Sequence, residues 1–282
     1  MAYVLLAALC SVLVSMLLKL ARRFDIDVGQ AVAWNYIATT ALTLLALRPP
    51  LQPLRHADAP WFALAALGLL LPTIFRALAA SVRHAGIVRS DVAQRLSLLI
   101  PLLAAFTLFG QPARDLQLLG CALGLLALAA MVWRRERTAT GGTPSTAWGW
   151  PLAVFAGFGL IDVLFKRVAA AGLPLGSALL AVFALALTVA FAIQLARRAR
   201  FTLRSALGGL LLGAGNFANI LFYLRAHRAL PDNPALVFAS MNLGVVVLGA
   251  LAGVALFKER LGRINALGLL LALTAITLLA WG

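Results

Sequence analysis

Charged residues are scarce in this chain, and acidic residues most of all. Only 12% of the 282 residues are charged, and Asp and Glu together number 9. About a quarter of a soluble globular domain is charged, so these residues are too few to cover a water-exposed surface. Apolar residues instead make up 63% of the chain, and the mean hydropathy is +0.97. The composition predicts a polytopic membrane protein with no room for a soluble domain.

Cysteine is nearly absent, and metal-binding patterns are not found. Cys10 and Cys121 lie inside apolar stretches, so they form neither a disulfide framework nor a metal-ligand spacing. The three histidines are too scattered along the sequence for a metal site. The sequence also has no P-loop pattern. We therefore expect no metal and no cofactor.

Charged or proline-rich breaks divide the chain into apolar runs of about the 20 residues that a bilayer requires. The ten predicted spans are 2–20, 29–47, 60–82, 90–109, 115–133, 147–166, 174–196, 204–224, 234–257 and 264–281. The longest polar stretch, residues 134–146, is typical of a linker. It separates a predicted five-helix half at 1–133 from a second one at 147–282.

The two halves resemble each other at a shift of 147 to 148 residues. The segments that match are Ser15–Lys19 with Asp162–Lys166, Leu108–Phe109 with Leu256–Phe257, and Leu119–Gly120 with Leu267–Gly268. Because each half has an odd number of spans, the second half enters the membrane upside down. Inverted repeats are the architecture of alternating-access transporters, which bind substrate where the repeats meet. Duplication for stability alone is the alternative interpretation.

One short motif resembles a known family. The segment Phe257–Leu261, Phe-Lys-Glu-Arg-Leu, is followed by Gly268 in an apolar helix. It resembles the repeat ending of the EamA-like family of the drug/metabolite transporter superfamily. In the matching first-half segment, Phe109–Ala113, Gln111 replaces the family's usual Glu. The resemblance covers essentially the whole chain. It implies an all-α integral membrane protein of ten transmembrane helices in two inverted five-helix repeats, which exports or transports small metabolites without ATP hydrolysis.

Lys and Arg, which number 24, gather in the short connections between spans. This pattern is typical of membrane topology and headgroup contact rather than nucleic-acid binding. The odd-numbered connections carry about twice as many of them as the even-numbered ones, so the positive-inside rule predicts both termini outside. The family resemblance implies both termini inside. We expect a multi-pass protein of the bacterial inner (plasma) membrane, either a monomer or a homodimer.

Ionisable side chains inside spans are the main candidates for function, because each costs roughly 2.5–3.5 kcal/mol at a helix centre. Arg76 and Arg95 are predicted at similar depth from the same face, on which Lys19 also lies. Asp91, Gln94 and Arg95 share one side of a helix at i, i+3 and i+4. Asp91 neutralises only one arginine, which leaves a cation for an anionic substrate. Alternatively, both arginines reach the headgroups and Asp91 pairs structurally with Arg95.

The second half has its own polar groups. Asp162 and Lys166 form an i, i+4 pair toward the other face, although Lys166 could simply mark a helix end. Asn216, Asn219 and Tyr223 share a face of the eighth span, and Asn242 lies in the ninth; amides of this kind often bridge helices. We predict substrate binding by Arg76, Gln94, Arg95, Asn216, Asn219, Tyr223 and Asn242. Gating or proton coupling is assigned to Lys19, Asp91, Asp162 and Lys166.

Proline and glycine positions predict helix shape and packing. Pro72 and Pro101 fall inside the third and fourth spans and predict kinks beside the charged residues. Small-xxx-small spacing predicts close helix packing at Gly120/Gly124, Gly209/Gly213 and Gly249/Gly253. The first of these pairs could equally serve a dimer interface.

The predicted function is a secondary transporter of a small anionic or zwitterionic metabolite, of the amino acid or organic acid class, and not an enzyme. Its partners are this substrate and the membrane lipids, without nucleic acid. One alternative is a lipid-carrier flippase, in which Arg76 and Arg95 hold a phosphate. The other is a membrane-embedded lipid or prenyl transferase, which needs several carboxylates for Mg²⁺. Asp91 and Asp162, the two deep carboxylates, are expected toward opposite faces.

Overall fold

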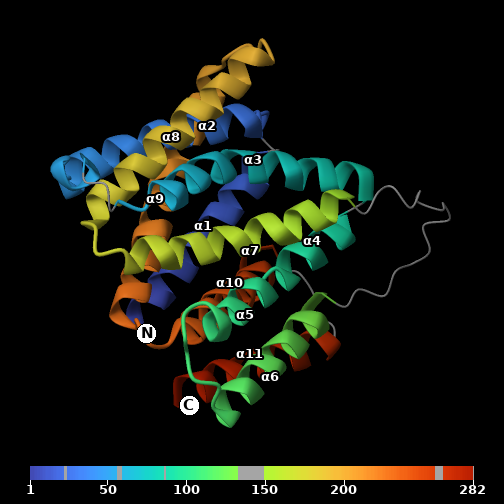
Figure 1. Ribbon diagram of the computed structural model, residues 1–282. Helices are drawn as coiled ribbons and strands as arrows, with labels where there is room; N and C mark the ends of the chain where they lie inside the picture. Colours follow the sequence, from blue (N-terminus) through green and yellow to red (C-terminus); the bar gives the residue numbers. More distant parts are fainter. Residues whose placement is uncertain (22–23, 56–58, 86, 133–148, 258–262, 282) are drawn as a thin grey trace. The chain divides into compact units, whose positions relative to one another are not determined.

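The computed structural model describes residues 1–282 except 22–23, 56–58, 86, 133–148, 258–262 and 282. All regular elements of this described part are helices (Figure 1), so the all-α prediction is confirmed. The predicted linker at 134–146 lies outside the described residues, as does the segment Lys258–Leu261 of the family motif.

The helices follow the predicted spans closely. They are α1 (Ala2–Ala21), α2 (Val28–Leu42), α3 (Trp61–Ala85), α4 (Ile87–Leu96), α5 (Leu99–Thr107), α6 (Asp115–Val132), α7 (Gly149–Ala170), α8 (Leu175–Ala196), α9 (Leu203–Ala229), α10 (Pro234–Phe257) and α11 (Arg263–Trp281). A π-helical turn, Thr43–Leu47, continues α2, and a 3₁₀ turn covers Gln52–Arg55. The predicted span 90–109 contains two helices, and each of the others overlaps one.

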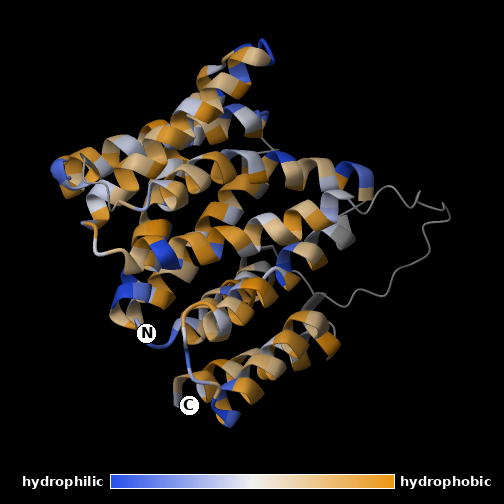
Figure 2. Ribbon diagram, viewed as in Figure 1, coloured by the Kyte–Doolittle hydropathy of each residue, from blue (hydrophilic) through white to orange (hydrophobic). Residues whose placement is uncertain are grey.

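Several helices are long and apolar enough to cross a membrane. Within the described residues there are 5 of them: Val28–Leu47, Trp61–Ala85, Leu175–Ala196, Leu203–Ala229 and Pro234–Ala252. Shorter apolar helices cover Ala2–Leu18, Val92–Thr107, Asp115–Ala130 and Ala266–Trp281. Figure 2 shows hydrophobic residues along most of the helical ribbon, with hydrophilic ones concentrated near helix ends. Length and composition thus support a membrane protein.

Pro101 explains why the predicted span 90–109 is interrupted. A proline lacks the N–H of the helical hydrogen bond, and its ring clashes with the carbonyl four residues earlier, which here belongs to Ser97. The Ser97 carbonyl instead accepts the N–H of Ile100 at 3.1 Å. The helix is therefore interrupted by a hydrogen-bonded turn at Ser97 and Leu98, between α4 and α5, whereas α3 runs through Pro72 without interruption.

The chain forms two compact units, each described here by itself. Unit 1 comprises Met1–Thr73 and Leu164–Pro231, and unit 2 comprises Ile74–Val163 and Asp232–Gly282. Each unit takes helices from both predicted halves, because helices of one half pack on helices of the other. In unit 1, α2 packs on α8 and α9; in unit 2, α6 packs on α11.

In unit 1, glycines bring α9 close to α2. A Cβ atom at Gly209 would lie 2.5 Å from the Ala31 carbonyl oxygen, and one at Gly213 would lie 2.6 Å from that of Asn35. Real side chains do not tolerate such distances, so only glycine fits at this crossing. The predicted close packing of the Gly209/Gly213 pair is confirmed.

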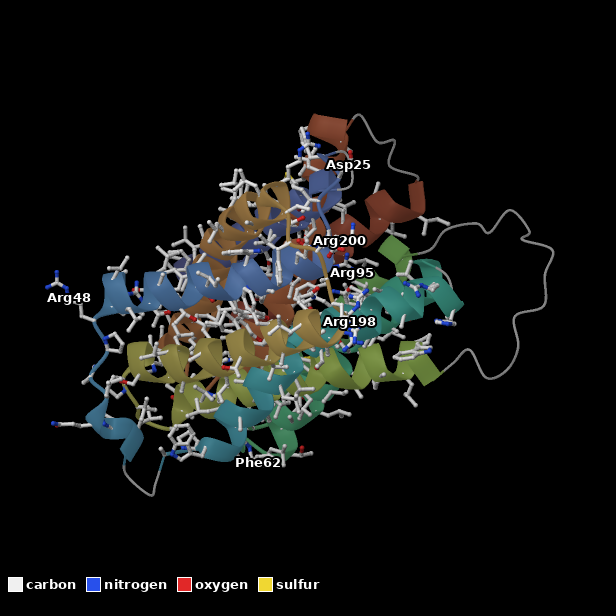
Figure 3. All side chains as sticks on the ribbon, turned by 90° about the horizontal axis from the view of Figure 1, so that it is seen from above. Asp25, Arg48, Phe62, Arg95, Arg198 and Arg200 are labelled. Carbon is white, nitrogen blue, oxygen red and sulfur yellow. The ribbon has the colours of Figure 1, made fainter. Side chains whose placement is uncertain are left out.

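Hydrogen bonds also hold the beginnings of α2 and α9 side by side. The Asp27 N–H donates to Ser205 Oγ at 3.1 Å, and the Thr202 N–H donates to Gln30 Oε1 at 3.1 Å. Gln30 Nε2 in turn donates to the Arg200 carbonyl at 2.8 Å. Arg48 lies at the other end of α2 from Arg200 (Figure 3). The two helices are therefore parallel.

In unit 2, α6 packs along α11 with similar closeness. A Cβ atom at Gly120 would lie 2.8 Å from Leu279 Cγ, and one at Gly124 would lie 3.1 Å from Leu243 Cδ1. The Gly120/Gly124 pair thus serves packing within the chain. A Cβ at Gly249 would meet no described atom within 4 Å, so the expected close packing is not seen at that glycine.

A cluster of buried amides joins the beginnings of α6 and α10. Gln111 Nε2 donates to Gln117 Oε1 at 3.0 Å, and Gln117 Nε2 donates to Asn233 Oδ1 at 3.0 Å. Gln111 Oε1 accepts the Ala235 N–H at 2.9 Å. This bond satisfies one of the N–H groups that a helix start leaves without an intrahelical partner. Gln111 therefore has a structural role.

We expect Gln111→Leu to lower the free energy of unfolding by about 2 kcal/mol, because it leaves a buried backbone N–H and two buried amides incompletely bonded. Thermal unfolding of the purified protein in detergent would measure the change. Gln52→Leu, in an exposed turn, is the matched control and should change stability by less than about 0.5 kcal/mol. Equal effects of the two substitutions would contradict a structural role for the cluster.

Candidate functional site

The predicted site residues divide between the two units. Unit 1 contains Lys19, Lys166, Asn216, Asn219 and Tyr223. Unit 2 contains Arg76, Asp91, Gln94, Arg95, Asp162 and Asn242. The backbones of Lys19 and Asp91 lie in α1 and α4, while their side chains lie outside the described part of the chain. Each unit therefore contains some of the predicted residues.

In unit 1, a pair of asparagines links α2 to α9. Asn216 Nδ2 donates to Asn35 Oδ1 at 3.1 Å, and Asn35 is 2% exposed. The bond lies next to the glycine crossing, because Gly213 contacts the Asn35 backbone. Asn216 thus acts at least as a bridge between helices. Asn219, one turn further along α9, is partly exposed.

Lys166, Tyr223 and His227 form a second buried group in unit 1. All three are nearly inaccessible, at 4%, 5% and 1% exposed. The Tyr223 and His227 rings meet edge to face at a centroid distance of 4.8 Å. Lys166 Nζ donates to the Pro231 carbonyl at 2.8 Å. An ammonium so deeply buried is costly in an apolar bundle, so Lys166 does more than mark a helix end.

Three polar atoms of α2 have no hydrogen-bond partner among the described residues. They are Trp34 Nε1, Tyr36 Oη and Thr40 Oγ1, and Tyr36 is 0% exposed. Buried polar groups nearly always have a partner in the protein or in ordered water. The three groups do not share one face, because Trp34 and Tyr36 are two residues apart and point to nearly opposite sides of the helix.

In unit 2, the break after α4 creates an irregular polar segment within an apolar run. Gln94 and Arg95 occupy the last turn of α4, and the Ser97 hydroxyl donates to the Gln94 carbonyl at 2.6 Å. The Arg95 cation complements the negative end of the α4 dipole. A Cβ at Gly159 of α7 would lie 2.9 Å from the Ser97 carbonyl oxygen, so α7 packs directly on the break.

The other predicted residues of unit 2 lie on three different helices. Arg76 is exposed on α3, nine residues or about 13 Å before the helix ends at a rise of 1.5 Å per residue. Asp162 is partly buried on α7. The Asn242 amide donates to the Phe238 carbonyl of its own helix at 3.0 Å, which leaves its carbonyl oxygen as an acceptor. Near it on α10, Ser240 Oγ is buried without a partner among the described residues.

Sequence reasoning missed several of these groups. Asn35, Tyr36 and Thr40 lie in the middle of an apolar span, where uncharged polar residues are common. His227 was assigned to a connection, because the eighth span was expected to end at residue 224. Helix α9 instead continues to Ala229 and buries this imidazole.

Metal chemistry has no support in the described part of the chain. No three His, Cys, Asp or Glu side chains come together there as a metal-ligand group. The described polar groups are instead amides, hydroxyls, an imidazole and cations, which suit hydrogen bonding to a small polar molecule.

Comparisons with known proteins bear on the family and the fold. No family model matches the sequence. An uncharacterized protein of Haemophilus influenzae is 41% identical over 277 residues, which cover 96% of this chain and 94% of that protein. A solved crystal structure, described only as that of a protein, matches with a TM-score of 0.69 at 16% identity. The matched region covers 98% of this chain and 96% of the chain in that crystal structure. This second similarity shows a shared fold.

Proposed function

We propose that this chain, which belongs to the same family as the Haemophilus influenzae protein, is a secondary transporter of a small anionic or zwitterionic metabolite. We assign it to the EamA-like transporters of the bacterial inner membrane, and the substrate class to amino acids or organic acids. The observation that carries the proposal is the broken helix α4–α5, with Arg95 in the turn before the break.

An interrupted helix of this kind supports transport because the backbone groups that a proline frees within a membrane must be satisfied by neighbouring helices, Ser or Thr side chains, or water. Transporters use such discontinuous helices at their substrate sites. In this chain the break follows directly on a guanidinium, which binds carboxylates and phosphates through two parallel hydrogen bonds. Gln94, on the same turn, adds an amide donor and acceptor.

The polar interior of unit 1 supports the same proposal. Asn216, Tyr36 and Tyr223 place amide and hydroxyl groups among apolar helices, and the buried Tyr36 hydroxyl has no hydrogen-bond partner within the described part of the chain. Such groups fit the polar atoms of a metabolite better than a lipid tail.

Contacts within the units also support ten crossings in two inverted halves. We number the connections between the ten predicted spans from one to nine in chain order. The hydrogen bond between Gln30 and Arg200 links connection one to connection seven. Ser177 Oγ donates to the Pro50 carbonyl at 2.6 Å and links connection six to connection two. Asn233 joins connection eight to connection four through Gln117. Odd-numbered connections thus contact odd-numbered ones, and even-numbered connections contact even-numbered ones. This is expected if every span crosses the membrane, because successive connections then lie on alternate membrane faces. The packed pairs α2 with α8, α5 with α10 and α6 with α11 are counterparts in the two halves.

Lys166 is our candidate for a gating residue. It ties the end of α7 to the connection between α9 and α10 through the Pro231 carbonyl. Release of this tie would free that connection to move during alternating access, in which parts of the protein rock about a fixed site. Asp91 and Asp162 are the candidate proton carriers if transport is coupled to protons.

A thermal-shift panel tests the proposal directly. Purified protein in detergent is mixed with anionic, zwitterionic and cationic amino acids and with organic acids. A ligand at about 100 times its Kd stabilises the folded state by about 2.7 kcal/mol. We expect stabilisation by an anionic or zwitterionic compound, and we expect Arg95→Gln to abolish it.

Arg83→Gln is the matched control, because Arg83 is an exposed arginine in the last turn of α3. This variant should keep the ligand response of the wild type. Stabilisation by cationic compounds alone, or a response that Arg95→Gln leaves intact, would contradict the proposed substrate charge and the role of Arg95.

A further inference from the structure

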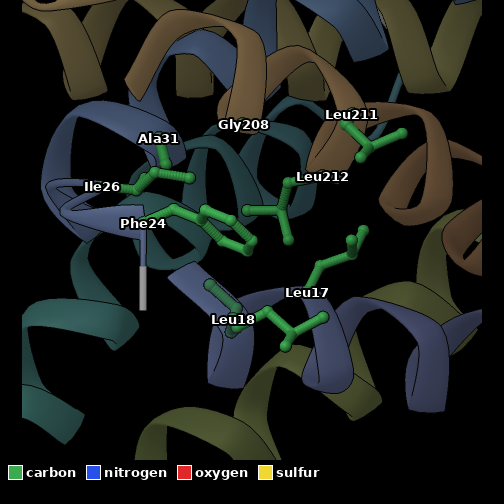
Figure 4. Close-up of a pocket in the computed structure, with 9 residues that line it drawn as sticks. Leu17, Leu18, Phe24, Ile26, Ala31, Gly208, Leu211 and Leu212 are labelled. Atoms are coloured by element: carbon green, nitrogen blue, oxygen red, sulfur yellow. The ribbon is translucent and has the colours of Figure 1, made fainter. Parts of the chain in front are cut away.

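A groove between α1 and α9 in unit 1 is not used by the proposed transport site. Its inner part is a cavity of about 140 Å³ lined by apolar residues: Leu17, Leu18, Leu20, Phe24, Ile26, Ala31, Gly208, Leu211 and Leu212. Figure 4 shows the residues around the cavity, with Phe24 from the segment after α1 pointing toward Leu212 of α9 and Ile26 lying beside Ala31. The cavity takes hydrocarbon and offers almost nothing to a polar ligand.

The outer part of the groove is larger and carries charge. It measures about 580 Å³ and shares Phe24, Ile26, Gly208 and Leu211 with the inner part, to which Asp25, Arg204 and Leu207 are added. The apolar side chains here are strongly exposed, at 61% for Phe24, 59% for Leu207 and 58% for Leu211. An apolar trough that ends at an arginine matches an acyl chain attached to an anionic headgroup.

The charge around this end of the groove is positive. Arg197, Arg198, Arg200 and Arg204 are all exposed, against the exposed Asp25 and Asp27. Arg198 and Arg200 lie in the segment between α8 and α9 (Figure 3). By sequence, Arg22 and Arg23 are also close to Phe24 along the chain. Clusters of Lys and Arg at a membrane surface attract anionic lipids by about 1 kcal/mol per residue.

Arg204 is the cation of the outer groove, which also contains the acidic Asp25. Arg204 is the second residue of α9, and a cation in the first turn of a helix opposes the positive end of the helix dipole. A phosphate at this place would interact favourably with both the dipole and the guanidinium.

We propose that the groove formed by Phe24, Ile26, Arg204, Leu207, Gly208 and Leu211 binds one anionic phospholipid, with an acyl chain in the trough and its phosphate on Arg204. The lipid fills the space between α1 and α9 and stabilises their packing. This site is independent of the metabolite and of the transport cycle.

Native mass spectrometry tests the proposal. Lipid-stripped protein in neutral detergent is mixed with equal amounts of phosphatidylglycerol and phosphatidylcholine that carry identical acyl chains. For the first lipid bound, we expect phosphatidylglycerol to be preferred by about fivefold, the equivalent of about 1 kcal/mol for one arginine. Arg204→Gln should reduce the preference to less than about twofold, and Arg204→Glu should invert it.

A second variant tests the trough. Leu211→Trp fills it from an exposed position, and it should weaken binding of the first lipid of either type. Leu210→Trp, on the neighbouring residue of α9, is the matched control, since Leu210 does not line the groove. Arg83→Gln controls for the loss of one positive charge, and both controls should bind as the wild type does. All variants must elute and unfold as the wild type does.

Three results would overturn the proposal. The first is equal binding of the two lipids by the wild type, and the second is an unchanged preference in Arg204→Gln. The third is displacement of the lipid by glycerol phosphate at the same concentration, because binding would then depend on the phosphate alone and not on the acyl chain. Lipid binding that Leu211→Trp leaves unchanged would likewise remove the trough as the site of the acyl chain.

Discussion

Gly209→Ala is expected to destabilise the protein by about 2–3 kcal/mol, even though alanine is the better helix former. The added Cβ would lie 2.5 Å from the Ala31 carbonyl oxygen, 2.5 Å from Trp34 Cβ and 2.9 Å from Ala31 Cα. Two of these three are backbone atoms, so no side-chain rotation relieves the overlap and α9 must move away from α2. Overpacking of this kind costs about 1–3 kcal/mol and occasionally more. The separation also strains the hydrogen bond between Asn216 and Asn35.

Thermal unfolding in detergent measures the effect. In a chain of this size, a loss of 2–3 kcal/mol corresponds to about 5–10 °C in Tm. Gly249→Ala is the matched control, since a Cβ there meets no described atom within 4 Å. We expect it to be neutral or to stabilise by up to about 1 kcal/mol through helix propensity. If both substitutions raised the Tm equally, the close crossing of α2 and α9 would be wrong.

Lys166→Met is expected to reduce transport by about tenfold or more while the Tm changes little. Methionine approximates the length of the lysine stem and fills the same buried space. It removes the charged hydrogen bond to Pro231, which is worth about 1.5–3 kcal/mol, but it also removes the desolvation cost of a buried ammonium. The two effects offset each other in stability. A gating contact worth 1.4 kcal/mol or more corresponds to at least about a tenfold change in an equilibrium.

Counterflow in proteoliposomes measures this transport, with the metabolite that gives the largest thermal shift in the panel described above. Arg167→Met is the matched control: Arg167 is the next residue of α7 but is exposed, so both transport and Tm should stay at wild-type values. Full transport in Lys166→Met would end its assignment as a gating residue. A parallel loss of transport and Tm would show instead that Lys166 only stabilises the fold.

Much of the fold could be predicted from the sequence. Each predicted span overlaps a helix, because an apolar run of sufficient length has few alternatives to the helix in a bilayer. The Gly209/Gly213 and Gly120/Gly124 spacings correctly predicted close helix crossings. Pro101 signalled a disturbance, although the sequence did not show that the helix would end and restart at Ser97.

The candidate site was harder to predict. The ionisable residues could be identified from the sequence because the free-energy cost of placing them inside a membrane span follows from the residue type. Asn35 and Tyr36 were missed because uncharged polar residues are cheap enough to be common in spans, so their position in the sequence carries little signal. His227 was missed because the predicted eighth span ends a few residues too early. The sequence therefore placed His227 in a connection, whereas it lies in the buried end of α9.

The sequence by itself determined that this is an apolar, all-helical chain with basic connections, since hydropathy and charge are properties of single residues and short runs. Only the tertiary structure decided which helices pack together, and it assembled each compact unit from both sequence halves. It also decided which polar groups are satisfied: Gln111 bonds to Gln117 and Ala235, whereas Tyr36 keeps a free buried hydroxyl among the described residues. The physical reason is that partners distant in the sequence meet only after the helices have packed, and the crossing geometry at a few glycines sets which side chains then come within reach.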